Sequence, residues 1–288
     1  MTLGMAWVRH LGRTREFVVA VDSRLSGGRA WDCSPKLLML PRSDCMLAFA
    51  GDSLDAYPLM LQIVNSINLH PRTLDRTIDI VHLKGHMARV WRSMRDFIHS
   101  LPRGQTVPDP YDVTFMFGGY SWREKDFRFW RMTSTGTTFT SENPKRWGPD
   151  YTTLRIHFFG DEPAVADAKK RLAKLMLERG KLPGGDFDME PFEVLRDIIR
   201  SGVHNSVGGP PQMAKSYEHM NTVPFAIYWP DRASGHATVL GRPLMEYELP
   251  RWPIVDPDNI LFAEPSAENA TRARTDEGDN IDERLTPF

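Results

Sequence analysis

The stretch that decides the fold is EFVVAVDSRLSGG, residues 16–28, in which an unbroken apolar run leads into a carboxylate and then a turn. Continuous β-branched and aromatic residues over 16–21 are typical of a strand buried on both faces. The run ends at Asp22, and a charge at the buried end of a strand is rare unless it is paired. Asp22 therefore either caps the following turn or pairs with a cation inside a site.

Two later segments are candidates to complete such a site. Lys36, in CSPKLLML, stands at the start of an apolar strand, where it is either an exposed strand-start lysine or the cation that meets Asp22. In AFAGDSLDAY, residues 48–57, a strand runs through Gly51 into a helix. A free N–H at Gly51 is an anion or oxyanion site, unless the polar residues behind it simply cap the helix.

The composition is that of a globular protein, with 288 residues, 41% hydrophobic and 25% charged, and a formal net charge of −1. Because the charge is close to zero, no global field recruits nucleic acid or an anionic membrane. No run approaches the ~20 apolar residues of a spanning helix, and no signal segment is recognised. Cys33 and Cys45 lack a CxxC partner, so we expect a cytoplasmic protein with reduced thiols.

The hydrophobic pattern alternates groups of strands with pairs of helices. Strands are expected at residues 2–8, 16–21, 36–40, 45–51, 111–121, 126–134, 136–141, 152–160, 224–229, 235–240 and 243–249, and helices at 52–69, about 75–100, 163–179 and 190–203. This order predicts an α+β protein with two sheets face to face and helix pairs outside them. We expect one domain over residues 1–250 and a C-terminal extension over 251–288, disordered after about 265.

Four features occur in a fixed order: Thr2 behind the initiator, AVDSRLSGG, Lys36, and FAGDSLDA before a helix. This order resembles the proteasome β-subunit family and its bacterial relative in the ATP-dependent two-component protease. The specific matches lie within residues 2–60, and the element order extends the likeness to about residue 249. The resemblance implies an N-terminal-nucleophile hydrolase with a four-layer αββα sandwich, acting on a peptide or amide.

The chemistry of that family suits a terminal threonine. A hydroxyl is a poor nucleophile at neutral pH and needs a base, and an α-amino group has a pKa of roughly 7.7–8.0. Removal of Met1 would give Thr2 both groups at once. The resemblance implies that Thr2 Oγ attacks a carbonyl, that Lys36 is oriented by Asp22 and promotes loss of the hydroxyl proton, and that the Gly51 N–H binds the oxyanion.

The chain departs from the family pattern at two places. The stretch FFGDEP has Gly160 where the family has glycine, but Asp161 where serine is usual. The stretch HNSVGG, residues 204–209, has His204 in place of an acid and Val207 in place of a serine. The groups that steady the terminal amine are therefore rebuilt or missing. Residues expected to support the site are Ser23, Arg24, Gly160 and Asp161.

Three functions remain open. The first is a threonine peptidase; the second is a catalytically silent ring scaffold or binding subunit; the third is hydrolysis of a small-molecule amide. The resemblance implies homo-oligomeric rings, and the sequence does not show whether an ATPase acts with them. No cofactor or metal is expected, because His82 and His86 lack the Glu of H-E-x-x-H and no phosphate-binding loop is present. The loop GGPPQ, residues 208–212, is expected to be exposed.

Overall fold

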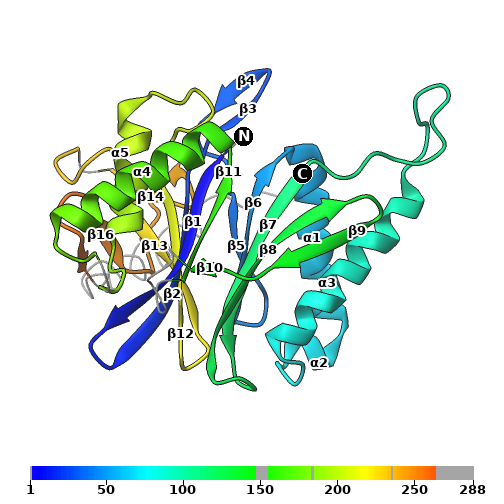
Figure 1. The fold of residues 1–288 in the computed structure, drawn as a ribbon, viewed down its shortest axis with the longest axis horizontal. Coiled ribbons are helices and arrows are strands. Elements are labelled where there is room, and N and C mark those ends of the chain that lie inside the picture. Colours follow the sequence, from blue (N-terminus) through cyan, green and yellow to red (C-terminus); the bar gives the residue numbers. More distant parts are fainter. Residues whose placement is uncertain (1, 147–154, 183–184, 235, 264–288) are drawn as a thin grey trace, which may run out of the picture.

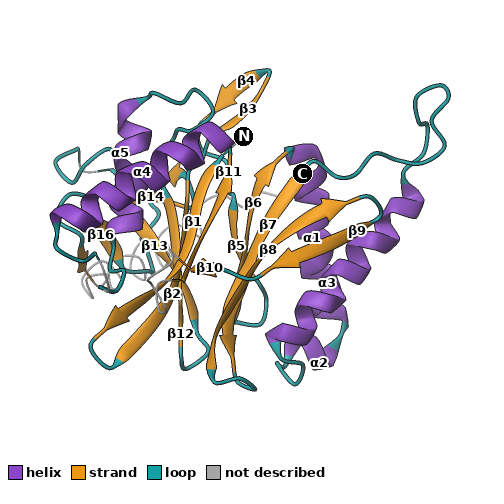
Figure 2. Ribbon diagram, viewed as in Figure 1, coloured by secondary structure: helices purple, strands orange, loops and turns teal. Residues whose placement is uncertain are grey.

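The computed structural model describes residues 2–146, 155–182, 185–234 and 236–263. Within these, the strands form two larger sheets and one small hairpin (Figures 1 and 2). The first sheet has the order β10-β11-β1-β2-β12-β13-β14-β15, with β16 joined to β13 and β17 to β16; the second has the order β5-β6-β7-β8-β9. The pairings are antiparallel except between β13 and β16.

The bounds of the strands and helices are as follows. The first sheet contains β1 (Leu3–Leu11), β2 (Thr14–Val21), β10 (Lys145–Arg146), β11 (Arg155–Gly160), β12 (Gln212–Tyr217), β13 (Thr222–Tyr228), β14 (Ala237–Val239), β15 (Arg242–Pro243), β16 (Ile254–Asp256) and β17 (Leu261–Ala263). The second contains β5 (Leu37–Met39), β6 (Cys45–Gly51), β7 (Val113–Ser121), β8 (Asp126–Thr135) and β9 (Thr138–Glu142), and the hairpin is β3 (Leu25–Gly27) with β4 (Arg29–Trp31). The helices are α1 (Ser53–Leu69), α2 (Pro71–Leu74), α3 (Ile80–Met94), the 3₁₀ turn Arg95–Phe97, α4 (Glu162–Glu178) and α5 (Glu190–Ser201).

Each large sheet packs one face against helices. The helices α4 and α5 lie along the first sheet, and α1 and α3 lie along the second (Figure 1). The helix α5 shows why: Phe192, Leu195 and Ile198 recur at helical spacing and are all buried in the core under the first sheet. The start of α1 is set by a local hydrogen bond, because the Asp52 side chain accepts the Leu54 N–H and caps the helix.

A third cluster of buried side chains comes from strands of both sheets. In β2, Val18 and Ala20 belong to the core beside α4 and α5, whereas Phe17 and Val19 belong to the cluster shared with β6, β7 and β8. The strand predicted at residues 16–21 is therefore buried on both faces. The predicted mixed architecture of helices and antiparallel sheets is confirmed. None of the helices in the described residues is both long and apolar enough to cross a membrane.

Several predicted boundaries are wrong. The helix expected at about 75–100 is shorter than predicted, because α3 covers only Ile80–Met94 and the 3₁₀ turn Arg95–Phe97 follows it. In the expected strand 243–249 only Pro243 is paired, as part of β15. The strand β12 was not predicted, because its sequence QMAKSY does not alternate between apolar and polar residues. Its polar side chains are nevertheless buried, each against specific partners. The expected extension contributes β16 and β17, and the disorder expected after 265 lies outside the described residues.

Candidate active site

Three predicted site residues from separate parts of the chain meet in one buried cluster. The Lys36 Nζ donates hydrogen bonds to Thr2 Oγ1 at 2.7 Å and to Asp22 Oδ1 at 2.9 Å. Thr2 is 1% exposed, and Asp22 and Lys36 are fully buried. The lysine therefore links the threonine hydroxyl to the carboxylate, with no intervening side chain.

The ends of three strands bring these groups together. Thr2 directly precedes β1 and Asp22 directly follows β2, and these strands pair with Gly4 opposite Val21. At their shared end, Leu3 and Asp22 bond reciprocally: the Asp22 N–H donates to the Leu3 carbonyl at 3.2 Å, and the Leu3 N–H donates to Asp22 Oδ1 at 3.0 Å. Lys36 arrives from the other sheet, immediately before β5. The site thus lies where the two sheets face each other.

The Asp22 carboxylate has its acceptor sites filled. Besides Lys36, it accepts backbone N–H groups of Leu3 at 3.0 Å, Arg24 at 3.1 Å and Gly208 at 3.1 Å. Burial raises the pKa of Asp22 and lowers the pKa of Lys36, and the ion pair between them opposes both shifts. A lysine whose pKa is lowered exchanges a proton with a neighbouring hydroxyl more readily near neutral pH.

Two glycines let the chain pass close to this cluster. Gly51 ends β6 and Gly160 ends β11, and both have a φ of +118°, a conformation that favours glycine. A Cβ at Gly160 would lie 1.9 Å from the Thr2 carbonyl oxygen, and one at Gly51 would lie 2.2 Å from the Asp112 carbonyl oxygen. The Asp161 N–H donates to the same Thr2 carbonyl at 2.8 Å. The close approach of Gly160 and the hydrogen bond from Asp161 hold Thr2 against the end of β11.

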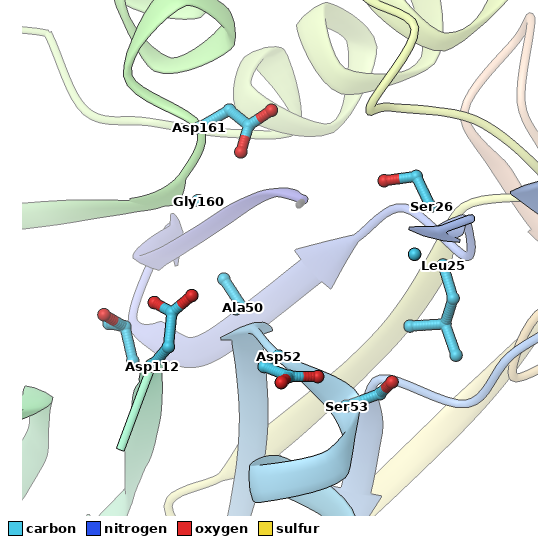
Figure 3. Close-up of a pocket in the computed structure, with 11 residues that line it drawn as sticks. Leu25, Ser26, Ala50, Asp52, Ser53, Asp112, Gly160 and Asp161 are labelled. Atoms are coloured by element: carbon cyan, nitrogen blue, oxygen red, sulfur yellow. The ribbon is translucent and has the colours of Figure 1, made fainter. Parts of the chain in front are cut away.

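A pocket of about 540 Å³ opens beside the cluster. Its walls come from the β3 segment, the end of β6, the start of β7 and the end of β11, so Gly51, Gly160 and Asp161 all line it (Figure 3). A volume of this size accepts a substrate side chain. Six of the predicted site residues therefore divide into the buried cluster of Thr2, Asp22 and Lys36 and a set that faces an open pocket, namely Gly51, Gly160 and Asp161.

Ser23 and Arg24 support the site in different ways. The Ser23 hydroxyl donates to the Pro210 carbonyl, which ties the end of β2 to the segment before β12. The Arg24 guanidinium pairs with Asp32 at 2.6 and 2.8 Å and donates to the Asn205 carbonyl at 3.2 Å. Only the backbone N–H of Arg24 reaches Asp22, so its side chain steadies the surrounding loops.

Gln212 is a site residue that sequence reasoning missed. Its Oε1 accepts the N–H groups of Lys36 at 3.0 Å and Leu37 at 3.2 Å, and its Nε2 donates to the Ser34 carbonyl at 2.7 Å and to Ser23 Oγ at 3.1 Å. The side chain is fully buried. The prediction that GGPPQ is an exposed loop is therefore wrong, because Gly208, Pro211 and Gln212 are buried and none of the five residues is exposed. The available signal was a lone glutamine flanked by Pro211 and apolar residues.

The two departures from the family pattern have other contacts. The His204 Nε2 lies 3.0 Å from Asp167 Oδ2 on α4, and Val207 is 2% exposed within the core beneath α4 and α5. Asp161 occupies the N-cap position of α4, but its side chain makes no capping hydrogen bond. In the described residues, no three His, Cys, Asp or Glu side chains gather to hold a metal ion, and His86 instead contacts Ser66 at 2.7 Å.

The comparisons with known proteins support the fold. No protein-family model matches this chain, and no curated protein matches it in sequence. Among solved structures, a Gly-1 mutant of Anbu from Hyphomicrobium sp. strain MC1 is similar, with a TM-score of 0.51 and 15% identity over 77% of this chain and 85% of that one. Anbu from the same strain gives a TM-score of 0.50 and 14% identity over 76% and 84%. The likeness shows a proteasome-like fold.

Proposed function

We propose that this protein is a threonine peptidase or amidase whose nucleophile is Thr2, freed by removal of Met1. The observation that carries the proposal is the 2.7 Å contact between Lys36 Nζ and Thr2 Oγ1, within a buried cluster completed by Asp22. Burying the Lys36 ammonium costs solvation free energy, which its contacts with Asp22 and Thr2 must offset. A threonine with no role beyond ordinary surface structure would not need such a contact. We also infer the αββα layering of such hydrolases, since each sheet has helices on one face and the other faces share a core.

The proposed reaction assigns a role to each group. The Thr2 amine, neutral near pH 8, takes the hydroxyl proton as Oγ attacks the substrate carbonyl. The ammonium of Lys36, held by Asp22, favours the alkoxide-like oxygen, and the Gly51 N–H receives the developing oxyanion. The amine then returns the proton to the leaving nitrogen, and water hydrolyses the resulting ester.

The direct test is chemical labelling of the mature protein. Intact mass and N-terminal sequencing should show Thr2 as the first residue, and an epoxyketone or boronate directed at terminal threonine should add one equivalent at that residue. The variant Thr2→Ala should fold and remain unlabelled. Wild-type protein that starts at Thr2 and resists every such probe would overturn the proposal.

The second candidate is a silent subunit that acts as a scaffold. Two observations favour it: His204 is engaged by Asp167, and Val207 lies in the core, so neither offers a polar group to the terminal amine. A protein that retains Met1 would support this reading. Labelled Thr2 combined with inactivity toward broad peptide libraries would instead favour a small-molecule amide as substrate.

We propose in addition that copies of the chain assemble through α1, as expected of a homo-oligomeric ring. Leu54, Leu61 and Leu69 lie on one side of this helix and are 81%, 60% and 83% exposed. Such an apolar stripe on a helix face is typical of a surface covered by a partner. The partner that we propose is a second copy of this chain, in a cytoplasmic assembly.

A further inference from the structure

The pocket beside Thr2 has carboxylates on opposite walls. Asp52 and Asp112 line one side, at the end of β6 and the start of β7, and Asp161 lines the other, at the end of β11 (Figure 3). Figure 3 shows the carboxylates on either side of the space that the pocket encloses. A substrate group that enters this space therefore meets negative charge from two directions.

Within the part of the chain that the structure describes, these carboxylates are not neutralised by direct ion pairs. Across the residues that the structure describes, no Lys, Arg or His side chain forms an ion pair with Asp52, Asp112 or Asp161. Among the described residues, the Asp52 carboxylate accepts only the Leu54 N–H, at 2.9 Å, and the Asp161 side chain makes no capping bond. The charge of Asp161 acts on Lys36, but Lys36 is already paired with Asp22.

A fourth carboxylate adds to the negative potential of the wall that Asp52 and Asp112 form. Asp55, on the first turn of α1, accepts the Asp112 N–H at 2.8 Å. Burial raises the pKa of Asp55, and the like charges of Asp52 and Asp112 add to this, while the Asp112 N–H and the charge of Arg95 act in the opposite direction. A bound cation would relieve this repulsion, so the wall favours positively charged ligands.

An unpartnered hydroxyl also points into the pocket. Ser26 Oγ is buried, makes no hydrogen bond with the described residues, and faces the space between the carboxylates in Figure 3. A buried hydroxyl without a partner is unfavourable, and a ligand with N–H donors would satisfy it. This observation is independent of the charges and points to a ligand in the same place.

We propose that the pocket selects substrates in which the residue whose carbonyl is attacked carries a cationic side chain, arginine or lysine. The proposal rests on the proposed function, because Gly51, which would bind the carbonyl oxygen, lines the same pocket. A guanidinium suits the site best, because its five N–H donors lie in a fixed plane and can bond a carboxylate in pairs, and carboxylates line both walls of the pocket.

Binding to the Thr2→Ala variant tests this preference without any reaction. The probes are a fluorescein-labelled tetrapeptide amide ending in arginine and the same peptide ending in citrulline, its neutral counterpart of equal shape. We expect the arginine peptide to bind at least about fivefold more tightly in fluorescence polarisation, with the ratio falling toward one as salt is raised. Equal affinities at low salt would overturn the proposal.

Substitutions in the Thr2→Ala background locate the preference. Asp112→Asn should remove most of it, and Asp52→Asn should reduce it while keeping the helix cap, because asparagine caps as well as aspartate. Asp197→Asn is the control, since this exposed carboxylate on α5 pairs with Arg196 away from the pocket. A preference that survives both pocket substitutions would refute the assignment. Because no nucleophile is present, these results are independent of the labelling experiment, whose failure would count only against hydrolysis.

Discussion

At the scale of single residues, Lys36 and Asp22 depend on each other. Both are fully buried, and each provides the other's charge partner at 2.9 Å. Lys36→Met should lower the rate of Thr2 labelling by at least about 100-fold. It should also lower the free energy of unfolding by about 3–5 kcal/mol, because the Asp22 charge is left buried without its partner.

The double variant Lys36→Met, Asp22→Asn separates these two effects. Removing the stranded charge should recover much of the stability measured by urea unfolding, whereas labelling should stay lost. Restored labelling in the double variant would show that Lys36 serves the fold alone. Full stability in the single variant would instead show that Asp22 is already protonated and neutral in the native protein.

Gln212 is a second buried residue whose contacts position Lys36. Its amide bonds the backbone of Lys36 on one side and Ser23 and Ser34 on the other. Gln212→Glu keeps the acceptor for the Lys36 N–H but loses the two donors, whereas Gln212→Leu loses both. We expect kcat to fall by about threefold and about tenfold respectively, with KM little changed, in a fluorogenic peptide assay. Equal stability losses with unchanged kcat would make Gln212 purely structural.

At the scale of elements, the glycine at the end of β11 controls where Thr2 lies. Gly160→Ala would place a Cβ 1.9 Å from the Thr2 carbonyl oxygen, at a φ of +118°. The matched control is Gly12→Ala, where φ is +59° and no atom lies within 4 Å. We expect the control to cost about 1 kcal/mol through backbone strain alone. Gly160→Ala should cost more and abolish labelling; equal costs in thermal unfolding would contradict the close approach.

The strand β12 carries a buried lysine whose charge makes stability depend on pH. Lys215 is 2% exposed, pairs with Glu16 at 3.1 Å and lies 3.7 Å from the centre of the Phe262 ring on β17. Burial lowers its pKa from 10.5 to about 8, against the opposing charge of Glu16. Between these two pH values the unfolded chain holds the proton and the folded protein does not, so this residue makes stability rise with pH.

Lys215→Met should remove that dependence. Glu16 keeps its partner Arg9 at 3.2 Å, so the substitution strands no charge. Relative to the wild type, we expect the variant to gain stability below pH 8 and to lose that advantage, on the order of 3 kcal/mol, as pH rises to 10.5. Urea unfolding at a series of pH values measures this. Parallel stability curves for the two proteins would show that Lys215 stays charged throughout.

The elements also show what the sequence could and could not predict. Continuous apolar runs such as residues 16–21, and helical spacing as in α5, have one plausible structure, so the main strands and helices were predicted. The strand β12 was missed because Gln212, Lys215 and Ser216 look like loop residues, and only tertiary contacts explain their burial. The same holds for the site: the order of Thr2, Asp22 and Lys36 was readable, but the approach of residues 112 and 212 depends on the packing of the two sheets.

At the scale of the whole molecule, the exposed face of α1 should decide assembly. Leu54, Pro58, Leu61 and Leu69 share one side of the helix, and the three leucines are 60–83% exposed. A lone exposed leucine is ordinary, but a stripe that runs the length of a 17-residue helix is covered in most stable proteins. If copies of this chain pack on that stripe, a charged residue introduced at its centre would be buried in each contact, at a cost of several kcal/mol.

Leu61→Lys tests the stripe against Leu261→Lys, a 59% exposed leucine on β17 outside it. In size-exclusion chromatography with light scattering, we expect the wild type and the control to form a closed assembly of uniform mass and Leu61→Lys to be monomeric. Since Leu61 is exposed in the single chain, the thermal stability of the monomer should be unaffected, which separates lost assembly from lost folding. A wild type that is strictly monomeric, or a Leu61→Lys variant that assembles normally, would place the contacts between copies elsewhere or exclude them.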